Sequence, residues 1–99
     1  MKVKARVCWL RKEEGGREHP PPGPKFSTVA RFEDEKGKFP REAWSLILEF
    51  ADPIDETNCH IAEVRLLNPE GPTRLLHPGS VFELYEGSHV VARGEVLES

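Results

Sequence analysis

Apolar and polar residues alternate with a period of two along most of this chain. From Val3 to Trp9 the odd positions are apolar, and Lys4 and Arg6 lie between them. This alternation is typical of a β-strand with one buried and one solvated face. The pattern recurs along the chain, and it predicts strands at Val3–Trp9, Phe26–Phe32, Trp44–Phe50, His60–Leu66, Val81–Tyr85 and His89–Leu97.

Proline and glycine separate the expected strands. The 9 prolines and 8 glycines are spread so that few windows could hold a regular helix. One helical alternative stays open at Pro40–Phe50, where the proline could occupy a first helical turn. Glu86-Gly87-Ser88 suits a tight hairpin between the last two strands. The spacing predicts one all-β domain over residues 1–99, either a small antiparallel barrel or a sandwich.

The aromatic residues mostly follow the apolar phase of these strands. We therefore expect them to fill a core rather than to form a platform for stacking bases. Phe39 and Tyr85 are the exceptions, because they fall off this phase or in loops, and they are candidates for exposed contacts. The core prediction applies to Trp9, Phe26, Phe32, Trp44, Phe50 and Phe82.

Composition indicates a soluble globular protein. Hydrophobic residues are 37% and charged residues 31% of the 99 residues, which allows one core without disulfides. The longest aliphatic run, 46–48, is far shorter than the roughly 20 apolar residues of a membrane helix. Charged residues at 11–14 interrupt any signal-peptide pattern near the start. We therefore expect a cytoplasmic protein without a membrane partner.

The candidate reactive residues do not form a recognisable motif. Cys8 and Cys59 are far apart and outside any CxxC pair, so we expect two thiols rather than a disulfide or a metal site. The four histidines are His19, His60, His77 and His89, and we expect them to be exposed or half-buried.

Catalytic arrangements are equally weak. Ser80, His77 and Asp52 could be combined into a triad on paper, but no nucleophile elbow accompanies them. We expect no catalytic residue, no bound metal and no cofactor.

One segment carries a resemblance to a known family. Residues 10–17, Leu-Arg-Lys-Glu-Glu-Gly-Gly-Arg, follow the first strand, and a proline-rich loop then leads to Pro24-Lys25-Phe26. This order resembles the opening of the third, C-terminal β-barrel domain of bacterial elongation factor Tu. Residues 46–54 and 82–96 resemble a later strand and the closing hairpin of that domain. The middle departs from the family, because 56–79 is longer and 34–42 is shorter than its counterpart.

The resemblance implies an antiparallel Greek-key barrel of about six strands that serves as a binding platform without catalysis. In that family a separate domain with a P-loop carries the GTPase chemistry, and this sequence has no such motif, so no nucleotide binding is expected. The family's third domain contacts its own GTPase domain, an exchange factor and aminoacyl-tRNA.

The family's tRNA contacts carry over only in part. Arg17 stands where the family has a loop arginine, and Glu86 and Gly87 stand where it has a Glu-Gly pair. Lys25 replaces a glutamine and could meet a phosphate as a point charge. Asp34 falls near a family threonine, and the carboxylates on both sides of it, at 33 and 35, would repel a phosphate backbone.

The distribution of charge favours one of two possible functions, protein interaction, over the other, RNA binding. The formal net charge is -3, but the first 25 residues contain seven basic and three acidic residues, and the remainder is acidic. We expect a protein-interaction module, whose partner the sequence does not identify. The alternative is an RNA-binding module of the tRNA type that uses the basic loop formed by Lys12, Arg17 and Lys25.

Overall fold

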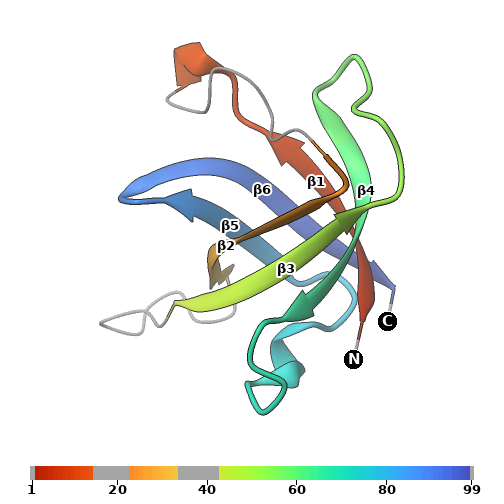
Figure 1. Ribbon diagram of the computed structural model, residues 1–99, viewed down its shortest axis with the longest axis vertical. Helices are drawn as coiled ribbons and strands as arrows, with labels where there is room; N and C mark the ends of the chain where they lie inside the picture. The colour runs from red at the N-terminus through yellow and green to blue at the C-terminus, as the bar shows by residue number, and fades with distance from the viewer. Residues whose placement is uncertain (1, 15–22, 34–42, 99) are drawn as a thin grey trace.

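The computed structural model describes residues 2–14, 23–33 and 43–98. Within these residues, six strands form one closed antiparallel barrel (Figure 1). Two single turns of 3-10 helix, η1 (Lys12–Glu14) and η3 (Thr73–Leu75), accompany the strands. The strands are β1 (Val3–Trp9), β2 (Lys25–Phe32), β3 (Trp44–Phe50), β4 (Cys59–Leu66), β5 (Val81–Glu86) and β6 (His89–Glu98).

The strand order is β1-β4-β3-β2-β5-β6, and pairing of β1 with β6 closes the barrel. Strands β2, β3 and β4 are consecutive neighbours, and β5 returns to lie beside β2, which is a Greek key. The prediction of a small antiparallel Greek-key barrel is therefore confirmed. The helical alternative is wrong for 44–50, because β3 pairs with β2 and β4 on its two sides. Residues 40–42 lie outside the described residues.

Alternate side chains of each strand point into the barrel and form its core. Phe32 and Phe82 are fully buried, with ring centroids 5.5 Å apart. Gly94 lies opposite Phe82 in the β5–β6 register, and a Cβ atom there would lie 2.3 Å from Cζ of Phe82. The glycine therefore makes room for the aromatic ring. The predicted core aromatics all pack in this core or against it, with Phe26, Trp44 and Phe50 partly buried.

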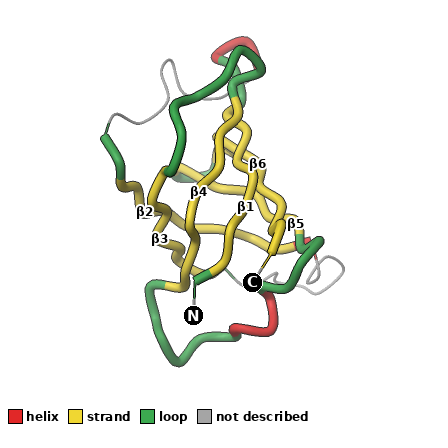
Figure 2. The backbone as a smooth tube through the Cα atoms, turned by 90° about the vertical axis from the view of Figure 1, so that its right-hand side faces the viewer, coloured by secondary structure: helices red, strands yellow, loops and turns green. Residues whose placement is uncertain are grey.

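The two ends of the barrel are closed by different side chains. We call the end at which β1, β3 and β5 finish the hairpin end, because the β5–β6 turn lies there. The indole of Trp9 packs edge-to-face on Phe26 and Phe50 at this end. Leu75 and Leu76, in and directly after η3, are buried at the opposite end. Figure 2 shows the two helical turns at opposite ends of the barrel. Within the described ranges, no helix has the length and apolarity needed to span a membrane.

Candidate functional site

A groove runs over the outer face of β2, between β3 and the β5–β6 hairpin. We call it the β2 groove, and its volume is about 530 Å³. Outward-facing side chains of β2, β3 and β5 form its floor, and the hairpin turn forms one wall. Its lining residues are Ser27, Thr28, Val29, Arg31, Ser45, Tyr85, Glu86, Gly87 and Ser88.

The chemistry of the groove is mixed rather than strongly charged. Val29, one of the lining residues, exposes 38% of its surface. The guanidinium of Arg31 lies over the ring of Tyr85, 5.5 Å from its centroid. The hydroxyl of Thr28 donates a hydrogen bond to the carbonyl of Tyr85, which fixes the start of the hairpin against β2. A ligand here would meet hydroxyl groups, one aliphatic side chain, one aromatic ring, the guanidinium of Arg31 and the carboxylate of Glu86.

The structure brings some of the predicted contact residues together and separates others. Glu86 and Gly87 line the β2 groove. Lys25 lines a different hollow of about 260 Å³, over Ile47 of β3. Lys12 belongs to η1 and lines neither hollow. Arg17 lies outside the described residues, as do Asp34, Phe39 and His19.

Sequence reasoning missed most of the groove. Tyr85 was expected as an exposed contact, and it does lie on the outer face, half-buried. Ser27, Val29 and Ser45 also line the groove, and none of them is among the predicted contact residues. The available signal was the valine at 29, an apolar residue on the polar phase of β2.

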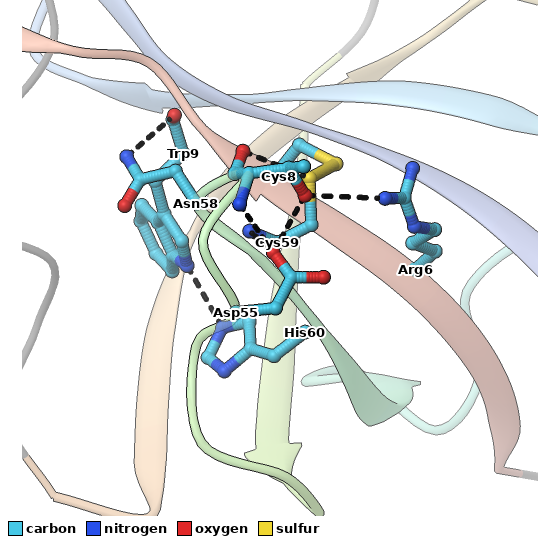
Figure 3. Close-up of a disulfide and its surroundings, with 8 residues drawn as sticks. Arg6, Cys8, Trp9, Asp55, Asn58, Cys59 and His60 are labelled. Atoms are coloured by element: carbon cyan, nitrogen blue, oxygen red, sulfur yellow. Dashed lines mark hydrogen bonds between the residues drawn. A yellow bond between two sulfur atoms is a disulfide. The ribbon is translucent and has the colours of Figure 1, made fainter.

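The prediction of two separate thiols is wrong, because Cys8 and Cys59 form a disulfide (Figure 3). The two cysteines are directly opposite in the β1–β4 register, with Cα atoms 4.0 Å apart. The N–H of Trp9 donates to the carbonyl of Asn58 at 2.9 Å, so the cysteines occupy the adjacent non-hydrogen-bonded pair. Cα atoms of paired strands are closest at such positions. A sequence separation of 51 residues gave no hint of this register.

The turn before β4 holds the disulfide end of the strand in place. The carboxylate of Asp55 accepts hydrogen bonds from the N–H groups of Thr57, at 2.9 Å, and Cys59, at 3.0 Å, and from the Thr57 hydroxyl. These hydrogen bonds, led by that of the Thr57 hydroxyl, lower the pKa of Asp55. Asn58 adopts a left-handed conformation with φ of 68° and donates its amide to the Trp9 carbonyl at 3.0 Å. The arrangement is a structural turn that holds the start of β4 against the end of β1 by hydrogen bonds.

His60 is buried, so the expectation of an exposed or half-buried side chain is wrong at this position. Its Nε2 accepts a hydrogen bond from the indole Nε1 of Trp9 at 2.8 Å, and its Nδ1 lies 3.1 Å from the carbonyl of Asp52. The ring also stacks on Phe50 at 4.3 Å. Burial lowers the pKa of His60. Both ring nitrogens are used within the fold, which gives this histidine a structural role.

The triad imagined from the sequence is not assembled. Asp52 follows β3 at the hairpin end, whereas His77 and Ser80 precede β5 at the opposite end. Within the residues that the structure describes, no three His, Cys, Asp or Glu side chains are grouped closely enough to hold a metal ion.

Several basic side chains on the outer face are neutralised by carboxylates. Lys2 lies 3.7 Å from Glu49, and Lys4 lies 3.6 Å from Glu98. The third pair joins Arg93 to Glu83 at 3.4 Å. In each of these pairs a basic side chain lies beside a carboxylate on β3, β6 or β5.

Comparison of the sequence with models of known protein families and with curated protein sequences gave no match.

Proposed function

We propose that this barrel is a non-catalytic protein-interaction module and that the β2 groove is its contact surface. The observation that carries the proposal is the groove itself, about 530 Å³ in volume, with an exposed aliphatic side chain, Val29, in its lining. Isolated apolar exposure is ordinary, but an apolar residue inside a groove with polar walls is typical of a binding site. Glu86 and Gly87, which were expected to contact a partner, contribute to one wall.

Electrostatics favour a protein over RNA as the partner. Affinity for nucleic acid comes mainly from several unpaired lysines and arginines that meet phosphates together. In the described part of the chain, Lys2, Lys4 and Arg93 face carboxylates, and Lys12 and Lys25 line no common hollow. An RNA module built on Lys12, Arg17 and Lys25 is the alternative.

A relationship to the third domain of elongation factor Tu stays a prediction. A Greek-key barrel is the architecture that the resemblance implies, but other families also use such barrels, so architecture alone does not identify one. A place in translation is part of the same prediction.

The disulfide bears on the compartment in which the module works. A cytoplasmic location was expected from the sequence, whereas stable disulfides occur mainly in oxidising compartments. Fractionation with alkylation of free thiols would show where the protein lies and whether Cys8 and Cys59 are joined there.

The function is tested by affinity capture from the protein's own cells with a pair of matched variants. Val29→Asp places a charge in the groove, and Leu97→Asp places the same charge at another exposed strand position, 47% exposed on β6. We expect a specific protein to be captured by the wild type and by Leu97→Asp, but not by Val29→Asp. Equal capture by the wild type and both variants would show that the groove is not part of the interface.

The RNA alternative is tested in parallel by titrating tRNA at about 150 mM salt, where nonspecific binding is weak. We expect little affinity. Submicromolar binding that weakens steeply with salt and is lost in Lys25→Glu together with Arg17→Glu would make the RNA module the better assignment.

A further inference from the structure

Within the part of the chain that the structure describes, no strand pairs with one edge of β2 in the half nearest the hairpin end. Strand β2 pairs with β3 along Lys25–Ala30, but with β5 only along Val29–Phe32. No β2–β5 pair is formed between the described residues beyond the pair of Val29 with Tyr85. Among the described residues, the first residues of β2 therefore have a neighbouring strand on one side only.

The direction of the backbone groups along β2 follows from one hydrogen bond. The carbonyl of Pro24 accepts the N–H of Phe50 at 2.8 Å, so the backbone of Pro24 faces β3. The backbone N–H and C=O groups of successive residues in a strand point alternately to the neighbouring strand on one side and on the other. The β2–β3 register is uninterrupted, so this alternation holds along the paired part of β2. The backbone groups of Lys25, Ser27 and Val29 thus face away from β3. Val29 meets Tyr85 there, but no described residue pairs with Lys25 or Ser27.

These two residues form a short template for another strand. Each presents one N–H donor and one carbonyl acceptor, and the two sets are about 7 Å apart, the spacing at which an antiparallel strand presents its matching groups. Both residues are exposed, and Ser27 lines the β2 groove. At Ser27 the template therefore opens into a volume large enough for a few residues of extended chain.

We propose that the partner of this module binds by strand addition: an extended segment of another protein pairs with Lys25 and Ser27 of β2 and carries an aliphatic side chain against Val29. The inference rests on the proposed function and specifies how the same groove is used. The segment runs antiparallel to β2, because it takes the place beside β2 in which β5, itself antiparallel, would lie if its pairing continued past Tyr85. Main-chain hydrogen bonds supply the affinity, and Val29 with the Tyr85 ring selects the side chain.

The test begins with random linear peptides displayed on phage and selected against the disulfide-bonded barrel. For each selected peptide, single N-methylation along its backbone removes one N–H at a time. Strand addition predicts that every second methylation abolishes binding and that the intervening ones have little effect. The amides of Lys25 and Ser27 should also become protected from hydrogen exchange when the peptide is bound.

A pair of variants at one position separates backbone from side-chain contacts. Ser27→Pro removes an N–H that no described residue uses, and proline is tolerated at such edge positions. We expect peptide affinity to fall about tenfold or more in Ser27→Pro and to change less than about twofold in Ser27→Ala, which keeps the donor. If Ser27→Pro does not fold, the methylation series on the wild-type barrel decides the question.

The other outcomes overturn strand addition. One such outcome is that binding of the selected peptides does not depend on every second methylation. Another is that the amides of Lys25 and Ser27 are not protected. Either result would mean that the module binds its partner in another way. Failure to select any peptide would exclude this mode, while the capture experiment with Val29→Asp would still test the proposed function separately. A free barrel that is already a dimer, with both amides protected, would assign the edge to a second copy of this chain.

Discussion

The indole of Trp9 donates a hydrogen bond to Nε2 of His60 at 2.8 Å, inside the hairpin end of the barrel. Because Nε2 accepts this bond, the neutral ring carries its proton on Nδ1, which then donates to the carbonyl of Asp52. Protonation of His60 would place a second donor against the indole N–H. The fold therefore favours the neutral ring.

This relationship predicts a pH dependence of stability. The folded state lowers the pKa of His60, mainly by burial, below the value of about 6.5 expected in the unfolded chain. The unfolded state then binds more protons at mildly acidic pH, so stability is complete above about pH 7 and falls as the pH decreases below about 6.5 towards the folded pKa.

The pH effect is measured by urea unfolding across this range. In His60→Gln the amide can still accept from Trp9 and donate to Asp52, but it does not titrate. As the pH falls, we expect the free energy of unfolding of the wild type to decrease relative to that of His60→Gln. A difference that does not vary with pH would contradict the assignment.

The Cys8–Cys59 disulfide should contribute substantially to stability. It joins residues separated by 51 positions, and a closed loop of this size lowers the entropy of the unfolded chain by the equivalent of about 4 kcal/mol. We expect a reductant to lower the free energy of unfolding of the wild type by about 2 to 4 kcal/mol. Cys8→Ala combined with Cys59→Ala is the control, because a reductant should not affect it.

Gly94→Ala should destabilise the barrel. The added Cβ would lie 2.3 Å from Cζ of Phe82, whose ring is fully buried and has little room to move. We expect a loss of about 1 to 3 kcal/mol in thermal or urea unfolding. Combining the change with Phe82→Leu should restore part of the loss, and Glu95→Ala, on the exposed phase of β6, should stay within about 0.5 kcal/mol of wild type.

Substitutions of Asn58 allow its backbone conformation and its side-chain hydrogen bond to be compared as separate contributions to stability. Its φ of 68° is unfavourable for most residues, and its amide donates to Trp9. Glycine adopts this conformation freely, so Asn58→Gly loses only the amide hydrogen bond. Asn58→Ala loses the same bond and is strained as well, and it should be less stable than Asn58→Gly by about 1 kcal/mol. Equal stabilities in urea unfolding would contradict this explanation.

The sequence by itself determined the strands of this protein. The alternation from Val3 to Trp9 and from Trp44 to Phe50 predicted β1 and β3 with the bounds that the structure shows. The reason is local, since side chains of a strand alternate between a buried and a solvated face and the period is visible without a partner. Gly87, with φ of 60°, likewise marked the β5–β6 turn.

Apart from the β5–β6 hairpin, only the tertiary structure decided which strands are neighbours, and the candidate site depends on that. The pairing of Cys8 with Cys59 and the burial of His60 under Trp9 both follow from the β1–β4 register, which no local pattern encodes. The β2 groove exists because β5 pairs with only half of β2. Register and strand order are set by long-range packing of the whole core, so residues far apart in sequence become a site only when the barrel closes.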